Sequence, residues 1–276
     1  MEHDPSGRAR GRAVSENQVA TFPDHAQVTA PGWLTARPIA HRGLHDAAAG
    51  VIENTAGAVR AALAAGYGME VDLQISADGE AMVHHDPALG RVTEGSERLE
   101  RATAAALKRV AFRDSGERMM TLGELCDLVA GRAPLLLEMK SRFDGDRRLP
   151  ERVATVLAGY RGPAAPMSFD TAQLALLRQC APHLPRGIVA AKYRPHPYWD
   201  QMPLLQRYGM GALIPAVLTA RPHFVAYSVN DLPAIAPTIA RHVLCLPVLT
   251  WVVRSEAERA RALRFADQII FEGFRA

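Results

Sequence analysis

Short apolar runs alternate with segments of helical periodicity along most of the chain, starting near Arg37. This alternation is typical of consecutive βα units, which build a parallel sheet. Eight strands are predicted in this way, at Pro38–His41, Met69–Ile75, Leu135–Lys140, Ala165–Phe169, Gly187–Ala191, Phe224–Val229, Pro247–Val253 and Gln268–Phe271. Eight units favour an α/β fold closed into a (β/α)8 TIM barrel over an open doubly wound sheet. The absence of a GxGxxG motif after the first strand agrees with that choice.

Polar residues with capping side chains mark the starts of two predicted helices. Asn54 is expected to cap a helix that runs through Ala65. Thr121 and Glu124 have the spacing of a capping box at the start of the helix Leu122–Val129.

One insertion interrupts the repeat after the second strand. The turn Ala77-Asp78-Gly79 leads into a further short strand, Met82–His85, and residues 87–120 then precede the third barrel strand. We therefore expect one barrel domain over residues 31–276, with a small insertion at about 76–120, preceded by a flexible polar arm over residues 1–30. A length of 276 residues suits a single barrel.

Composition excludes several classes of partner. Hydrophobic residues make up 48% of the chain, which fits a soluble protein with a sizeable core, and a net charge of +3 is too small to favour nucleic acid. No apolar run is long enough for a membrane span. A sparse, odd set of three cysteines fits a reducing cytosol, so a cytoplasmic location is expected, and the oligomeric state, including a homo-oligomer, is left open. Cys126, Cys180 and Cys245 lack metal or disulfide spacing and are expected to be free, buried thiols.

Charged residues occur in pairs on two of the predicted barrel strands. Glu70 and Asp72 are two positions apart, as are Glu138 and Lys140, so the members of each pair point to one face of the strand. Buried strands seldom tolerate charge unless it is paired or binds a metal. Since barrel active sites lie at the carboxyl ends of the strands, these pairs indicate a functional site there.

The types of residue at these strand ends indicate their chemistry. Glu70, Asp72 and Glu138 offer hard oxygen ligands, which suit one divalent cation, Mg²⁺ or Ca²⁺, better than zinc. His41 and His85 end two of the strands, and an ordinary pKa near ~6.5 suits a histidine for general acid and base catalysis near neutral pH.

Further residues at the strand ends suit a phosphate group. Arg42 and Lys140 supply positive charge for phosphoryl oxygens. Ser168 is interpreted as a phosphate contact, with core packing as the alternative, and Trp251 as a wall for the substrate, with barrel core as the alternative. Together with a carboxylate-bound cation and two histidines, this set predicts phosphate-ester chemistry.

The same residues belong to an ordered series of short motifs. In chain order these are His41-Arg42-Gly43, Glu53-Asn54-Thr55, Glu70-x-Asp72, His85-Asp86-Pro87-x-Leu89-x-Arg91-x-Thr93, Thr121-Leu122-x-Glu124, Leu137-Glu138-Met139-Lys140, Ser168-Phe169 and the strand of Trp251. The series resembles the glycerophosphodiester phosphodiesterases over roughly residues 38–272. No single motif decides, but the order and spacing together are specific.

The resemblance implies a (β/α)8 barrel in which His41 and His85 are general acid and base, while Glu70, Asp72 and Glu138 hold the metal. It also implies a small-molecule substrate, a glycerophosphodiester cleaved to glycerol 3-phosphate and an alcohol. In the reaction commonly proposed for the family, the glycerol 2-hydroxyl attacks phosphorus, and water opens the resulting cyclic phosphate. The histidines exchange roles between these two steps.

The chain departs from the family pattern at two strand ends. Trp251-Val252-Val253-Arg254 stands where Trp-Thr-Val-Asn is more common, and the last strand ends in Phe271-Glu272 where Thr-Asp is usual. Both departures fall near the expected position of the substrate alcohol, so the resemblance does not imply a headgroup. No role is assigned to Glu272.

Several residues have simpler interpretations. Glu138 and Lys140 could form only a buried ion pair with each other. Glu53 either reaches the metal or merely precedes the helix cap, and Asp86 is expected to bond locally in the turn before Pro87. His84, on the opposite face of its strand, is expected to be structural.

Three other functions compete with hydrolysis of glycerophosphodiesters. A phospholipase D-like or phosphoinositide-type barrel acting on lysophospholipids needs an apolar lip, but residues 87–120 are rich in charge. A metal-dependent lyase or aldolase shares the carboxylate-bound cation but does not need two histidines. A non-catalytic phosphodiester-binding protein has no use for an acid and a base.

Overall fold

The computed structural model describes residue 1, residues 30–194, 201 and 204, and residues 217–276. Residues 2–29 of the predicted N-terminal arm lie outside the described part of the chain. Within that part, no helix is long and apolar enough to cross a membrane.

The described strands form a closed parallel barrel, as the alternating pattern predicts. The barrel strands are β1 (Ile39–Ala40), β2 (Gly68–Ile75), β4 (Leu135–Met139), β5 (Ala164–Ser168), β6 (Gly187–Ala190), β7 (Phe224–Ser228), β8 (Val248–Val253) and β9 (Gln268–Phe271). Neighbours pair in parallel around the ring, and β1 pairs with both β2 and β9, which closes it. The (β/α)8 prediction is therefore confirmed.

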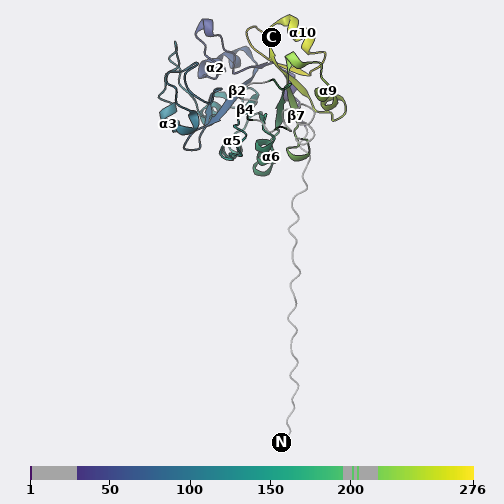
Figure 1. Ribbon diagram of the computed structural model, residues 1–276, viewed down its shortest axis with the longest axis horizontal. Coiled ribbons are helices and arrows are strands. Elements are labelled where there is room, and N and C mark those ends of the chain that lie inside the picture. Colours follow the sequence, from purple (N-terminus) through teal and green to yellow (C-terminus); the bar gives the residue numbers. More distant parts are fainter. Residues whose placement is uncertain (2–29, 195–200, 202–203, 205–216) are drawn as a thin grey trace.

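Helices surround the strands (Figure 1). Those described are α1 (Trp33–Ala36), α2 (Ala56–Ala65), α3 (Ala104–Leu107), α4 (Leu122–Val129), α5 (Arg148–Ala158), α6 (Thr171–Cys180), α9 (Ile235–His242) and α10 (Glu256–Ala262), with 3-10 turns η1 (Ala47–Ala49), η2 (Leu99–Arg101) and η4 (Val229–Asp231). Apolar residues on the outer face of the strands, such as Val71 and Leu137, share one buried cluster with Val59 of α2 and Leu125 of α4. The larger of the two barrel cores therefore lies between the strands and the helices.

Alternate residues of the strands fill the barrel interior. Leu136, Phe224, Leu249 and Ile270 belong to a second buried cluster, to which Leu34 of α1 adds at the amino-terminal end of the barrel. This apolar filling leaves the opposite end of the interior, at the carboxyl ends of the strands, for polar residues.

Gly187 makes room for the largest side chain of this interior. A Cβ at position 187 would lie 2.2 Å from two ring atoms of Phe224, so Gly187→Ala should force the ring out of its place and destabilise the fold by about 1–3 kcal/mol. Gly159→Ala is the matched control, because its Cβ would meet nothing closer than the Val156 carbonyl at 3.8 Å. Urea unfolding should separate the two variants, and equal stabilities would contradict this account of the interior.

The insertion after β2 forms a small subdomain core of its own. β3 (Ala81–Val83) pairs antiparallel with the end of β2, and it begins one residue and ends two residues before the predicted Met82–His85. Beyond it, Met82, Leu99, Phe112 and Met119 bury their side chains together. The insertion therefore has a buried cluster separate from the two barrel cores.

Two local predictions need correction. The cap of α2 is Thr55, whose hydroxyl accepts from the backbone of Ala58, and not Asn54, which has a φ of 57° and turns its side chain inward. The cysteines are free, but only Cys126 is buried, whereas Cys180 and Cys245 are exposed because one ends α6 and the other follows α9 in a turn. The capping box of Thr121 and Glu124 at α4 is confirmed.

Candidate active site

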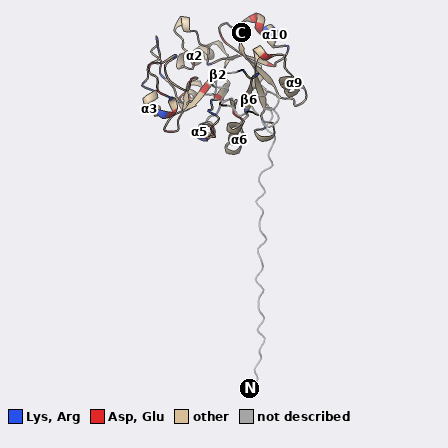
Figure 2. Ribbon diagram, in the orientation of Figure 1, with Lys and Arg blue, Asp and Glu red and all other residues tan. Residues whose placement is uncertain are grey.

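The predicted metal ligands meet at the carboxyl end of the barrel. Parallel register places Asp72 of β2 directly beside Glu138 of β4, and Glu70 lies two residues earlier on the same face. One carboxylate oxygen from each of the three lies within 4.8 Å of the other two. Figure 2 shows the acidic positions of β2 within the fold, where Glu70 and Asp72 are each only 1% exposed.

Lys140 compensates part of this buried charge. Its Nζ lies 2.8 Å from Asp72 Oδ1 and 2.5 Å from Glu138 Oε1. Glu138 and Lys140 do form an ion pair, but not with each other alone, because Asp72 shares the ammonium. Arg42 adds a second positive charge, with Nε 3.3 Å from Asp72 Oδ2, so three ionised carboxylates would leave one negative charge uncompensated.

The surroundings of Glu70 disfavour its ionised form. Burial raises its pKa well above the ordinary value, and the charges of Asp72 and Glu138 raise it further. Burial acts on the pKa of Asp72 in the same direction, but Lys140, His85 and Arg42 outweigh it and lower that pKa. Glu70 Oε1 is buried and accepts no hydrogen bond from the described residues. An unsatisfied oxygen in a net negative cluster of hard ligands fits the predicted divalent cation.

Two residues in left-handed backbone conformations orient these carboxylates. Asn54, with a φ of 57°, donates from Nδ2 to Asp72 Oδ2 at 2.8 Å and accepts from the backbone of Asp72 at 3.1 Å. Arg42, with a φ of 53°, donates its backbone N–H to Glu70 Oε2 at 3.1 Å. Such conformations are unfavourable for most residues and collect at functional sites.

Each predicted catalytic histidine binds a carboxylate through Nδ1. For His41 the partner is Glu272 Oε2, at 2.6 Å, and for His85 it is Asp86 Oδ1, at 2.7 Å. His41 Nε2 lies 3.9 Å from Glu70 Oε2, which places it beside the carboxylate cluster. Burial lowers the pKa of His41, and the hydrogen bond to Glu272 opposes that effect. Asp86 thus bonds locally, as predicted, and its partner through Oδ1 is the neighbouring histidine.

A charged chain connects the two histidine regions. Glu53 Oε1 accepts from Arg42 Nη1 at 2.8 Å and from Arg91 Nη2 at 2.6 Å. Arg91 also donates from Nε to Asp86 Oδ2 at 2.7 Å. Glu53 therefore does neither of the two things expected of it: it lies outside the carboxylate cluster and holds two arginines instead.

Ser168 is not brought to the cluster. Its hydroxyl donates to the Met139 carbonyl at 2.7 Å and accepts from the backbone of Asp170 at 3.1 Å. A further contact to Gln173 of α6, at 3.2 Å, places it on the helix-facing side of β5. The hydroxyl of Ser168 is therefore used in hydrogen bonds that connect β5 with β4 and with the loop before α6.

Trp251 lies at the edge of the barrel interior. Its ring donates from Nε1 to the Ala226 carbonyl at 3.0 Å and meets the ring of Phe169 edge to face, with 5.8 Å between centroids. The indole is half-buried, which is compatible with the predicted wall.

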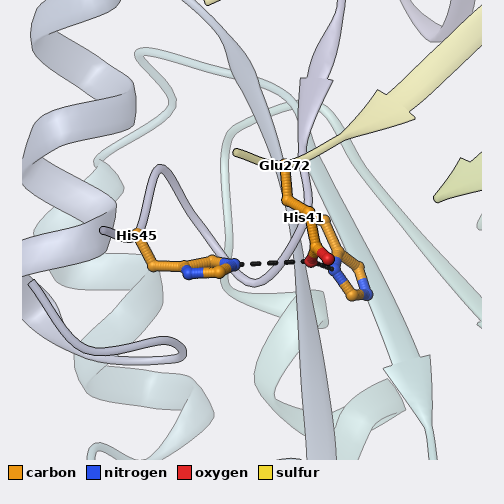
Figure 3. A group of neighbouring side chains, drawn as sticks. All are labelled: His41, His45 and Glu272. Atoms are coloured by element: carbon orange, nitrogen blue, oxygen red, sulfur yellow. Dashed lines mark hydrogen bonds and ion pairs between the residues drawn. The ribbon is translucent and has the colours of Figure 1, made fainter. Parts of the chain in front are cut away.

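Glu272 is the main residue that sequence reasoning missed. A signal for it exists in the register of barrel closure: Ala40 pairs with Phe271, so the next residues, His41 and Glu272, leave the barrel side by side. His45 approaches the same carboxylate, with Nε2 3.5 Å from Glu272 Oε2 (Figure 3). These contacts need a closed ring and are invisible in a linear pattern.

Comparisons with known proteins show the family to which this chain belongs. The family model described as the glycerophosphoryl diester phosphodiesterase family matches residues 41–271. A glycerophosphodiester phosphodiesterase of Caldanaerobacter subterraneus subsp. tengcongensis is 30% identical over 161 residues, which are 55% of this chain and 65% of that relative. The chain thus matches just under two thirds of that curated protein.

Solved structures show the same fold. A phosphodiesterase of Oleispira antarctica, solved in complex with the product sn-glycerol-3-phosphate, gives a TM-score of 0.71 at 18% identity, covering 88% of this chain and 94% of that one. A glycerophosphoryl diester phosphodiesterase assigned by similarity in Silicibacter pomeroyi gives 0.66 at 28% identity, covering 85% and 89%. Because the family model spans the barrel from its first histidine to its last strand, the chain belongs to the glycerophosphoryl diester phosphodiesterase family.

Proposed function

We propose that this protein hydrolyses glycerophosphodiesters to glycerol 3-phosphate and an alcohol, with two histidines as general acid and base and one divalent cation. The observation that carries the proposal is the meeting of His41 with three buried carboxylates, one of which has an unsatisfied oxygen. The relative from Oleispira antarctica, solved with sn-glycerol-3-phosphate, supports this class of substrate.

Glu70, Asp72 and Glu138 would hold the cation, either Mg²⁺ or Ca²⁺. When bound, the cation would stabilise the negative charge of the phosphoryl oxygens, including the charge that develops on them during the reaction. Arg42 and Lys140 add fixed positive charge beside the same carboxylates, so they would bind and orient the phosphodiester.

His41 and His85 would move the protons of two successive steps. In the first, one imidazole takes the proton of the glycerol 2-hydroxyl as that oxygen bonds to phosphorus. The other imidazole donates a proton to the alcohol oxygen as its bond to phosphorus breaks. In the second step the roles reverse, and water opens the cyclic phosphate. The indole of Trp251 would form a wall beside the bound substrate.

The deciding experiment is release of glycerol 3-phosphate from glycerophosphocholine, with EDTA and with Mg²⁺ or Ca²⁺ added back. Release that depends on the cation supports the proposal. Release from lysophosphatidylcholine but not from glycerophosphocholine would favour the phospholipase, and binding without turnover under every condition would favour a phosphodiester-binding protein.

Glu70→Gln should weaken the cation site more than the fold. The amide keeps the shape of the side chain but loses the charge that a hard cation needs, so the Ca²⁺ concentration for half-maximal activity should rise about 10–100-fold. Excess cation should restore part of the rate. The control is Glu97→Gln, an exposed carboxylate of the insertion. An unchanged metal requirement in Glu70→Gln would remove this residue from the site.

A further inference from the structure

Glu272 uses both of its carboxylate oxygens. Oε2 is 2.6 Å from His41 Nδ1 and 3.5 Å from His45 Nε2 (Figure 3). Oε1 accepts from Arg254, with Nη2 at 2.8 Å and Nε at 2.9 Å. The guanidinium therefore fixes the carboxylate from one side while the histidines approach it from the other.

This environment favours an ionised Glu272. The hydrogen bond from His41 and the approach of His45 lower its pKa, and burial opposes them without reversing the effect. An ionised carboxylate can only accept hydrogen bonds. At 2.6 Å the shared proton must therefore come from His41 Nδ1, which leaves Nε2 of a neutral ring without one.

We propose that Glu272 is the positioning residue of His41: by accepting the Nδ1 proton, it fixes the ring with an unprotonated Nε2 beside the carboxylate cluster. The inference rests on the proposed function, in which Nε2 of His41 exchanges a proton with the substrate. Asp86 has the corresponding contact to His85 Nδ1, at 2.7 Å. Each histidine is thus held by a carboxylate that lies outside the carboxylate cluster of Glu70, Asp72 and Glu138.

The two departures from the family pattern form one unit. Arg254 follows β8 and Glu272 follows β9, and their side chains pair directly across these neighbouring strands. Glutamate has one more rotatable bond than the aspartate that is usual at this position. Its carboxylate therefore needs an additional contact to stay in one orientation. The guanidinium of Arg254 supplies that anchor, which accounts for both departures by a single contact.

The side chains of His41, His45 and Glu272 also have donor atoms close enough to bind a metal ion, but the neighbouring positive charges argue against one. His41, His45 and Glu272 offer ligand atoms within 4.8 Å of one another. Arg254 already occupies Glu272 Oε1, and burial lowers the pKa of His41, with the charge of Arg42 acting in the same direction. Two neighbouring cationic groups oppose a further cation, and the guanidinium of Arg254 favours the ionised carboxylate of Glu272.

The tautomer of His41 is the direct test, because it can be read without any activity. In protein labelled with ¹⁵N-histidine, two-bond correlations at pH 8 distinguish the two neutral tautomers, and the His41 signals are those missing from His41→Ala. The expected result is the Nδ1-protonated form in the wild type and loss of its predominance in Glu272→Gln. An Nε2-protonated wild type, or a tautomer unchanged in Glu272→Gln, would overturn the inference.

Kinetics on glycerophosphocholine supply the second readout. Glu272→Gln should lower kcat about 10–100-fold, while KM and the half-saturating Ca²⁺ concentration stay within about threefold. Glu272→Asp should retain more activity, since it keeps a carboxylate. The control is Glu258→Gln, which removes a carboxylate that contacts the backbone of Arg254 at 2.7 Å.

An equal loss of kcat in Glu258→Gln, or a Glu272→Gln effect on KM alone, contradicts a positioning role. Circular dichroism of each variant checks that the barrel is intact. A wild type without hydrolysis of any glycerophosphodiester would defeat the proposed function, and the tautomer measurement would still decide the inference about Glu272.

Discussion

His85→Ala should lower kcat for glycerophosphocholine by about 10²–10⁴-fold at saturating cation, and His41→Ala should do the same. This is the range for loss of a general acid or base. The side chain of His85 is 32% exposed and lies outside the barrel core, so its removal should hardly change stability. Initial rates of glycerol 3-phosphate release, together with a thermal unfolding curve for each variant, measure both quantities.

The control for these variants is His242→Ala, which removes an exposed imidazole at the end of α9. It should keep the wild-type rate. Rates within threefold of wild type for His41→Ala or His85→Ala would show that the reaction does not use that imidazole as acid or base.

Lys140→Met should destabilise the metal-free protein by about 3–5 kcal/mol, the magnitude for removing one partner of a buried ion pair. The ammonium is the cation that lies between Asp72 and Glu138, and without it three buried carboxylates repel one another. Saturating Ca²⁺ should recover much of the loss, because the cation neutralises the same groups. Urea unfolding with EDTA and with Ca²⁺ measures both states.

Lys108→Met is the matched control. Lys108 pairs with Glu124, but both side chains are more than 40% exposed, and such surface pairs contribute only about 0–1 kcal/mol. The stability of this variant should not depend on Ca²⁺ beyond the wild-type response. Equal losses in the two lysine variants would mean that the buried cluster needs no compensating charge.

The sequence was sufficient for the barrel and for most of the site, because both follow from strand periodicity. Charged residues two positions apart share a strand face, so their spacing alone places Glu70 and Asp72 together. Parallel register then makes Glu138 their neighbour. The closed ring was predictable from eight strand-like runs, although β1 has only two residues in regular pairing.

Other features depend on contacts that periodicity does not encode. Asn54 resembles a helix cap in sequence, but its left-handed backbone sends the amide to Asp72 and leaves the cap to Thr55. Ser168 ends a strand like the site residues, yet it lies on the helix-facing side, where Gln173 binds it. Its predicted contact with phosphate has no support in this geometry.

The imidazole of His41 follows β1 and is bound by the carboxylate of Glu272, which follows β9, and 231 positions of sequence separate them. During synthesis His41 is made long before Glu272. A growing chain that already contains nearly all of its strands therefore still lacks the carboxylate that positions His41. Contacts of such long range are slow to form and follow the closure of shorter loops. We therefore expect hydrolytic activity to appear last during synthesis or refolding, after β9 has paired with β1 and closed the barrel.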